Sequence, residues 1–347
     1  MNLFTKVDLP ATDFKIDYNS RLAFFGSCFA DNISAQFASR KFNVLANPFG
    51  TVYNPVSLES QIKAIADGKV FGENDVFKDE RCDGLWHCWD AHSSLSASTR
   101  EECIAKLNAA TTQARDFLRK ADVVFITLGT AFVYYLKDSG KPVSNCHRQD
   151  PDLFERRLIS VDEATDAIRR IVESLRKLSP VAKVVFTVSP LRHMSDGAHN
   201  NTLSKATLQL AVNSAISNVT TVPSASSGTF PAVDYFPSYE IVMDELRDYR
   251  FYSDDMVHLS KTAEAYIFER MVSTYCDERT REDISKVEKF MKMANHRILD
   301  ENAHATQSFQ QKIKVQATAL EKQIPGLDLS CEKGVFLENF NNAKQHF

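Results

Sequence analysis

Short apolar runs alternate along the chain with stretches in which apolar residues recur at helical spacing. Three runs are almost wholly apolar and too short for helices: Arg21–Phe25, Val123–Leu128 and Val184–Val188. Such runs are typical of strands that are buried on both faces of a sheet. After the first run, Phe29, Ile33 and Phe37 recur every four residues and predict a helix. The alternation predicts an α/β fold with a mostly parallel sheet covered by helices.

Capping boxes mark the starts of two further helices. In such a box a serine and a glutamate three residues later satisfy each other's backbone N–H groups. The pattern occurs twice: at Ser98 with Glu101 and at Ser160 with Glu163. Other helices are expected around Leu203–Ile216 and after Ser260, whereas the prolines and the glycine between residues 47 and 55 favour irregular backbone.

The last part of the chain has a different character. Glycine is absent from Arg281 until Gly326, and the stretch Glu301–Gln323 predicts a long, rather polar helix. Helical spacing is kept before it by several apolar residues: Val287, Phe290, Met291, Ala294 and Ile298. We therefore expect one α/β domain over residues 1–280 and a helical extension over residues 281–347, which is suited to packing or to homo-oligomer contacts.

Composition narrows the classes of protein and partner. The 347 residues are 44% hydrophobic and 25% charged, with a net charge of -4, so a globular protein without a nucleic-acid partner is expected. The sequence contains no apolar segment of membrane-spanning or signal-peptide length, which predicts a cytoplasmic protein without a membrane partner. Seven cysteines without a CxxC pair suit free thiols in a reducing compartment.

Ser27 lies where a predicted strand passes into a predicted helix. A serine hydroxyl at a helix start can simply cap the helix, or it can act as a nucleophile beside backbone N–H groups that stabilise an oxyanion. Gly129 and Ser189 also follow predicted strands directly. Because the carboxyl ends of parallel strands meet at one edge of the sheet, all three residues are expected there.

A base for such a nucleophile is available near the end of the α/β region. Asp255 precedes His258 by three residues, on a loop that enters a predicted helix. The carboxylate can bind the imidazole Nδ1–H and leave the other ring nitrogen free to take a proton from a serine. Ser27, His258 and Asp255 together form a candidate catalytic triad.

Seven blocks along the chain resemble the GSCFA family, which belongs with the SGNH (GDSL-like) hydrolases. They are Gly26–Ala30 (GSCFA), Asn47–Thr51 (NPFGT), Leu128–Thr130 (LGT), Asn145–His147 (NCH), Ser189–His193 (SPLRH), Tyr235–Glu240 (YFPSYE) and Asp244–Tyr249 (DELRDY). The resemblance extends from roughly Phe24 to Met271. It implies a flavodoxin-like three-layer α/β/α sandwich and hydrolysis of an ester or acyl group of a small molecule or glycan, with Ser27, Asp255 and His258 at the catalytic positions.

The resemblance also implies an oxyanion hole, and here the sequence departs from the superfamily. The serine's own N–H is one donor there, and Gly50 matches a second donor, a glycine N–H. The third donor is the asparagine of a GxND block, but this chain reads Gly129-Thr130-Ala131-Phe132 at that point. The hydroxyl of Thr130 or the amide of Asn145 is a candidate replacement, because losing one donor typically lowers the rate by about 100- to 1,000-fold.

Other interpretations of the same residues stay open. Cys28 is an alternative nucleophile, since a helix start lowers a thiol pKa, although a small packing residue under the turn is expected instead. His193 is a competing base or a substrate-binding residue, and Arg192 suits an anionic substrate group. The spacing of His87, Cys88, His92, Cys146 and His147 matches no usual zinc site, so neither metal nor cofactor is expected. A non-catalytic module that binds an acylated ligand or glycan in the same cleft is the alternative function.

Overall fold

The computed structural model describes residues 5–9, 12–81, 84–219, 233–295 and 304–334. Its strands are β1 (Arg21–Gly26), β2 (Asn43–Ala46), β3 (Phe77–Lys78), β4 (Trp86–His87), β5 (Val123–Leu128), β6 (Phe132–Leu136), β7 (Pro142–Val143), β8 (Phe154–Leu158), β9 (Lys183–Val188) and β10 (Val233–Tyr235). Its helices are α1 (Cys28–Ser39), α2 (Pro55–Asp67), α3 (Arg100–Leu118), α4 (Val161–Leu178), α5 (Ala198–Val219), α6 (Ser238–Glu240), α7 (Lys261–Tyr275), α8 (Glu278–Ala294) and α9 (His304–Gln323).

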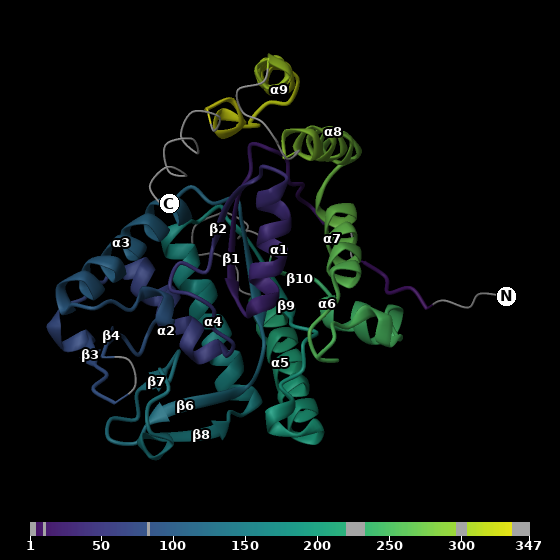
Figure 1. Ribbon diagram of the computed structural model, residues 1–347. Helices are drawn as coiled ribbons and strands as arrows, with labels where there is room; N and C mark the ends of the chain where they lie inside the picture. The colour runs from purple at the N-terminus through teal and green to yellow at the C-terminus, as the bar shows by residue number, and fades with distance from the viewer. Residues whose placement is uncertain (1–4, 10–11, 82–83, 220–232, 296–303, 335–347) are drawn as a thin grey trace. The chain divides into compact units, whose positions relative to one another are not determined.

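The central sheet has the strand order β2-β1-β5-β9-β10, and β1, β5, β9 and β10 pair in parallel (Figure 1). Numbered along the chain, these strands lie in the order 2-1-3-4-5, which is the order of flavodoxin-like sheets. The predicted α/β fold with a mostly parallel sheet is therefore confirmed. In such sheets ligands bind where the strand order reverses, which here is at the carboxyl ends of β1 and β5.

Both faces of the central sheet are buried. Ala23 and Phe25 of β1 join an apolar core with α2, α3, α4 and α5, and helices α2, α4 and α5 pack against one another in that order. Leu22 and Phe24 alternate with them and point to the other face, yet each is at most 1% exposed. Phe24 stacks there on Phe125 of β5, with ring centroids 4.8 Å apart. Burial on both faces explains why these strands are apolar throughout.

Most of the predicted central elements are found at their expected places. The strand Val123–Leu128 and the capping box of Ser160 with Glu163 are confirmed, and the helix predicted after Ser260 begins at Lys261. The helix expected near Ser98 begins two residues later than this serine, because Thr99 is the N-cap and its side chain accepts Glu102 N–H at 3.2 Å.

Two features were not predicted. Helix α2 follows the proline-containing stretch directly, with Asn54 as its N-cap and Pro55 at its first position, where a proline costs no hydrogen bond. A second, antiparallel sheet with the order β7-β6-β8 is inserted after β5.

Two predicted helices differ in length from the expectation or are described in part. The helix expected around Leu203–Ile216 is longer and spans all of α5. Of the helix expected at Glu301–Gln323, the structure describes residues 304–323. Residues 301–303 and Ile298 lie outside the described residues.

The chain divides into two compact units. The first unit contains Met1–Pro10, Arg21–Ser34 and Val44–Phe268, and the second contains Ala11–Ser20, Ala35–Asn43 and Glu269–Phe347. In the second unit Ile16 N–H donates to Tyr275 O at 2.7 Å, and helix α8 contributes Val287 to the buried residues and contacts α9. The central sheet, apart from its first residue in β2, and all residues of the site described below belong to the first unit.

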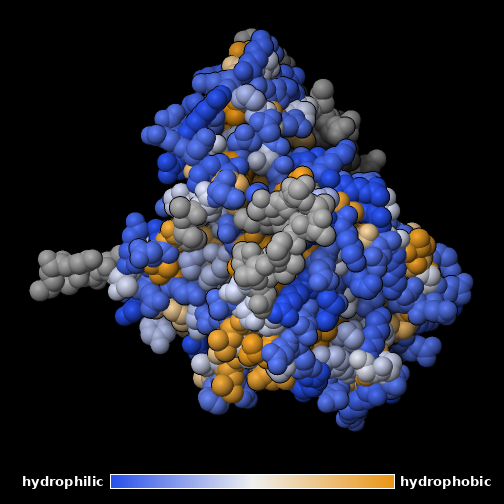
Figure 2. Space-filling model, turned by 180° about the vertical axis from the view of Figure 1, so that it is seen from behind, coloured by the Kyte–Doolittle hydropathy of each residue, from blue (hydrophilic) through white to orange (hydrophobic). Residues whose placement is uncertain are grey.

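The face of the molecule opposite to the view of Figure 1 is largely hydrophilic. Figure 2 shows hydrophilic side chains over most of the face seen from behind, with hydrophobic side chains gathered in a patch near its lower edge. Among the helices in the described part of the chain, none combines the length and the apolar character needed to cross a membrane.

Candidate active site

A cavity of about 470 Å³ lies at the carboxyl end of the central sheet. Ser27 and Cys28 reach it from the turn between β1 and α1, and Ser189 from the end of β9. Thr130 follows β5, and His258 comes from the loop before α7. The fold thus brings Ser27 and His258, expected from distant parts of the sequence, to one cavity at the reversal of strand order.

The turn between β1 and α1 is held by a polar clamp, which consists of the side chains of Asn47, Thr51 and Asp31. Gly26 has φ +123°, and a Cβ at this position would lie 2.0 Å from Thr127 O, so only glycine fits. Asn47 Oδ1 accepts Gly26 N–H at 2.8 Å, and Asn47 Nδ2 donates to Asp31 Oδ1 at 2.7 Å. Thr51 Oγ1 donates to the other oxygen of Asp31 at 2.8 Å. The Asn47–Thr51 block therefore fixes the turn to the first turn of α1.

Ser27 lies beneath this turn. Its N–H donates to Thr127 O at 3.1 Å and so continues the pairing of β1 with β5. The residue is 1% exposed, and its Oγ is buried without a hydrogen-bond partner among the described residues. A nucleophile needs access to substrate and contact with a base, and the N–H expected at the oxyanion is already used. Ser27 thus borders the cavity as a buried residue whose hydroxyl makes no hydrogen bond among the described residues.

Cys28 is the first residue of α1, is only partly buried and borders the cavity. Burial, followed by the Asp31 carboxylate, raises the pKa of its thiol above the ordinary range. The backbone N–H groups of Phe29 and of Cys28 itself act in the opposite direction and lower this pKa. The thiol is thus accessible and lies against helix N–H groups, but it needs a base to become a nucleophile at neutral pH.

The Asp255–His258 pair has the geometry expected from the sequence. His258 Nδ1 lies 2.5 Å from Asp255 Oδ2, while Asp255 Oδ1 accepts the backbone N–H groups of Val257 and His258 at 2.9 and 2.8 Å. The hydrogen bond from the imidazole is the largest cause, and these two N–H groups the next, that lower the pKa of Asp255 to about 2. With Nδ1–H donated to the carboxylate, Nε2 is the proton acceptor of a neutral ring.

The candidate oxyanion donors differ in their placement. Gly50 does not border the cavity, and its N–H donates to Asn47 O at 2.7 Å, so the glycine serves the close turn beside His92 instead. Thr130 and Asn145 both border the cavity. The Thr130 hydroxyl accepts a backbone N–H at 3.1 Å and shares a hydrogen bond with a serine at 3.0 Å. Asn145 Oδ1 accepts His147 N–H at 2.8 Å, which leaves its amide nitrogen as the donor end.

Arg192 and His193 also border the cavity. Burial, and then the nearby Lys205, lower the pKa of His193 to about 4, so its ring is neutral at physiological pH. The ring packs edge-on against Tyr53, with centroids 5.3 Å apart. A ring that binds protons this weakly is a poor general base, so a contact with substrate suits His193 better than the base role.

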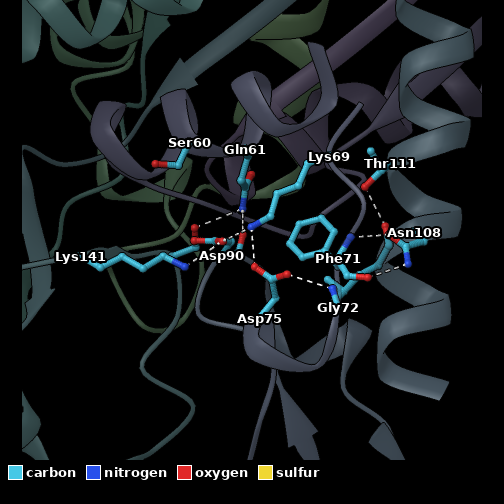
Figure 3. Close-up of polar contacts among 12 residues, drawn as sticks. Ser60, Gln61, Lys69, Phe71, Gly72, Asp75, Asp90, Asn108, Thr111 and Lys141 are labelled. Atoms are coloured by element: carbon cyan, nitrogen blue, oxygen red, sulfur yellow. Dashed lines mark hydrogen bonds and ion pairs between the residues drawn. The ribbon is translucent and has the colours of Figure 1, made fainter. Parts of the chain in front are cut away.

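The inserted antiparallel sheet supplies one wall of the cavity through Phe132, Tyr134 and Arg156. Helix α2 holds the adjoining chain: Ser57 Oγ donates to Val143 O at 2.9 Å. Close by, Asp90 gathers a polar cluster with Gln61, Lys69 and Lys141 (Figure 3). Lys141 Nζ lies 3.0 Å from Asp90 Oδ2, and Gln61 Nε2 donates to Asp90 O at 2.9 Å. The cluster fastens the wall to α2.

Asp90→Ala is expected to lower the free energy of unfolding by about 1.5–3 kcal/mol, because it leaves two lysines without their shared carboxylate. The side chain of Asp90 is 11% exposed, whereas that of Asp67, paired with Lys63 in α2, is 59% exposed. The control Asp67→Ala should change stability by less than about 0.5 kcal/mol. Urea denaturation followed by fluorescence reports the first unit, which contains both tryptophans. Equal effects of the two substitutions would contradict the prediction.

Lys205 is a residue of the site that the sequence analysis missed. It lies in α5, is 1% exposed, and its Nζ donates to Gly129 O at 2.6 Å and to Ser189 O at 2.7 Å. These carbonyls end β5 and β9 at the cavity. A signal was present, since Lys205 precedes Leu208 by three residues and Val212 by seven and so shares their buried helical face.

Two of the residues considered for zinc make other contacts. His87 Nδ1 lies 2.6 Å from Ser96 Oγ, and His147 Nε2 donates to Cys88 O at 2.9 Å. Within the described ranges, no three or more His, Cys, Asp and Glu side chains are arranged to hold a metal ion.

Comparisons with known proteins complete the description. A carbohydrate esterase family 3 structure from Talaromyces cellulolyticus has 12% sequence identity and a TM-score of 0.27, over 51% of this chain and 66% of that chain. An acetyl xylan esterase from the rumen bacterium Butyrivibrio proteoclasticus has 14% identity and a TM-score of 0.30, over 77% of this chain and 64% of that chain. The chain thus spans just under two thirds of the length of either. No curated protein sequence matches it.

The sequence profile of the GSCFA family matches residues 21–271. This range contains the turn with Ser27 and Cys28, the strands of the central sheet and the Asp255–His258 loop. The family suggested by the sequence blocks is confirmed. The chain belongs to the GSCFA family.

Proposed function

We propose that this protein hydrolyses an acyl ester of a small molecule or glycan, with the thiol of Cys28 as nucleophile and His258, oriented by Asp255, as general base. One observation carries the proposal: Cys28 and an imidazole whose Nδ1 is bound to a carboxylate border the same cavity at the reversal of strand order. Nucleophile, base and base-orienting acid are the parts that acyl transfer requires.

The proposal changes the nucleophile expected from the sequence. Ser27 was the expected residue, but its Oγ is buried without a partner among the described residues and its N–H is used by Thr127. Cys28 is more exposed, and its backbone N–H and that of Phe29 belong to the first turn of α1, where helix N–H groups lack intrahelical partners. The same groups that lie against the sulfur suit an oxyanion formed next to it.

The reaction proceeds in two halves. His258 Nε2 takes the Cys28 proton, and the thiolate attacks the acyl carbon. The ester C–O bond then breaks, the imidazolium gives its proton to the departing alkoxide, and an alcohol and a thioester result. In the second half His258 takes a proton from water, the hydroxide attacks the thioester, and the C–S bond breaks. The carboxylic acid leaves and Cys28 regains its proton.

Trapping the acyl-enzyme tests this function. The full chain is mixed with p-nitrophenyl acetate, quenched with acid and digested, and the peptide with residues 27 and 28 is analysed by mass spectrometry. We expect p-nitrophenolate release and an acetyl group on Cys28 that neutral hydroxylamine removes, as it does from thioesters. A hydroxylamine-resistant acetyl group on Ser27 would restore the serine mechanism. Ligand binding without release or acetylation would identify a binding module and contradict the proposed function.

A further inference from the structure

The side chains that border the Cys28 cavity include positive charges and no aspartate or glutamate, among the residues that the structure describes. Arg156, Arg192, His193 and His258 all contribute to the wall. This is unexpected in a chain whose net charge is -4. The two arginines carry the charge of this wall, and a carboxylate just outside it pairs with one of them, since Arg156 Nη2 lies 2.5 Å from Asp196 Oδ1.

Arg192 has no such partner. No carboxylate in the described ranges lies within ion-pair distance of it, although it is partly buried. It borders both the Cys28 cavity and a neighbouring cavity of about 550 Å³ that includes Met256 and Tyr249. A guanidinium that lines a cavity without a protein carboxylate is suited to bind a carboxylate or phosphate of a ligand, often through two parallel hydrogen bonds.

Lys205 is a second cationic side chain that forms no ion pair with a carboxylate of the described residues. Its Nζ is bound to two backbone carbonyls, and no carboxylate of the described chain pairs with it. Burial lowers its pKa to about 7, so the ammonium form still persists near neutral pH; Cys28 acts to raise this pKa and Arg192 to lower it. A buried ammonium is expensive unless negative charge lies near. Its hydrogen bond to Ser189 O places the ammonium directly behind the cavity wall, where an anionic ligand would bring that charge.

Most charged groups around His193 create a positive electrostatic potential at its ring. Besides burial, Lys205, Arg156 and His258 all lower the pKa of His193, and only Asp196 raises it. Asp31 opposes this trend, because after burial its carboxylate is the next largest cause that raises the pKa of Cys28. The two Asp31 oxygens are occupied by Asn47 and Thr51, however, so they are turned to the clamp under the turn.

We propose that the cavity binds a substrate with an anionic group, a carboxylate or phosphate, next to the acyl carbon, and that Arg192 is its direct partner with Lys205 as the supporting charge. The anion-binding property stands on the charges alone, and only the identification of the ligand as a substrate rests on the proposed hydrolase function. Arg192 is in this view a specificity-determining residue.

A matched pair of thiol reagents measures the potential at Cys28 without any turnover. Iodoacetate carries a carboxylate, whereas iodoacetamide has nearly the same shape and no charge. The alkylation rates at Cys28 are followed by mass spectrometry of its peptide and expressed as the ratio of iodoacetate to iodoacetamide. The exposed Cys331 of the same chain gives the reference ratio.

We expect the ratio at Cys28 to exceed that at Cys331 about tenfold or more, corresponding to one decade of binding preference. Arg192→Gln should lower the Cys28 ratio at least about fivefold, Lys205→Met should lower it as well, and Arg192→Lys should retain most of it. The control Arg247→Gln removes an exposed cation of the neighbouring cavity and should leave the ratio unchanged. Equal ratios at Cys28 and Cys331, or no effect of Arg192→Gln, would overturn the proposal. Because Arg192 lies at the cavity surface, the result for Arg192→Gln decides the proposal whether or not Lys205→Met folds.

Substrate preference gives the second measurement. p-Nitrophenyl hemisuccinate should have about a tenfold higher kcat/KM than the neutral p-nitrophenyl pentanoate, mainly through KM, and Arg192→Gln should remove this preference. Protection of Cys28 from iodoacetamide by succinate or by inorganic phosphate distinguishes the two kinds of anion. A raised alkylation ratio without ester turnover would keep the anion site and reject the hydrolase. Turnover without preference for the anionic ester or protection by either anion would keep the hydrolase and reject this inference.

Discussion

Cys28→Ala is expected to lower kcat for p-nitrophenyl acetate by about 10⁴-fold or more, the scale on which removing a nucleophile acts. The loss is large because Cys28 combines access to the cavity with a place in the first turn of α1. Cys146, the other thiol that borders the cavity, has its pKa raised to about 11 by burial. Steady-state release of p-nitrophenolate measures the effect, and circular dichroism confirms that the variant is folded.

Two comparisons make this result specific. Cys331→Ser removes an exposed thiol that does not border the cavity and should retain full turnover. Cys28→Ser keeps an attacking oxygen at the same position, but the loss should still exceed about 100-fold, because a serine hydroxyl gives up its proton far less readily than a thiol. If Ser27→Ala abolishes turnover while Cys28→Ala retains it, the assignment of Cys28 is wrong and the serine mechanism applies.

Asp255→Asn is expected to lower kcat by about 10³- to 10⁴-fold, as the loss of the orienting carboxylate does in Ser-His-Asp enzymes. An asparagine oxygen can still accept the N–H groups of Val257 and His258, so the loop should keep its shape. It cannot supply the negative charge that faces His258 Nδ1 at 2.5 Å and stabilises the imidazolium formed in the reaction. Asp254→Asn, which changes the adjacent exposed carboxylate, is the matched control and should change kcat less than about threefold.

The pH dependence of turnover is a further test of the same assignment. The pKa of Asp255 is lowered to about 2, so its negative charge is present throughout the range above pH 4 and is lost only as the pH falls through about 2. A plot of kcat/KM against pH between 4 and 9 should therefore contain no inflection from this carboxylate. For the substitutions described above, equal losses of kcat in Asp254→Asn and Asp255→Asn would show that the Asp255 carboxylate does not orient His258.

Local patterns in the sequence were enough to predict the main elements of the sheet and the Asp255–His258 pair. The strand Val123–Leu128 is buried on both faces and so has an uninterrupted apolar sequence. Asp255 and His258 are three residues apart within one loop, and their contact depends on few degrees of freedom. Helix α2 was missed because Pro55, read as a sign of irregular backbone, is favourable at the first position of a helix.

The nucleophile could not be chosen from the sequence because Ser27 and Cys28 are neighbours on the same turn. Both border the cavity, and the deeper burial of Ser27 depends on its N–H, which pairs with Thr127 of a strand far along the chain. The role of Gly50 likewise depends on a contact, the close approach of its turn to His92. Each of these assignments requires knowing which distant backbone lies beside the turn.

Periodicity and short sequence blocks were thus sufficient to predict the α/β class, three strands of the central sheet, the family and the contact between Asp255 and His258. The folded chain was needed to learn that Ser27 is buried, that Cys28 borders the cavity, and that Lys205 and Arg192 lack a carboxylate partner within the described residues. Access, burial and the electrostatic field at a side chain are sums over neighbours from several elements. No single segment of the sequence contains those neighbours.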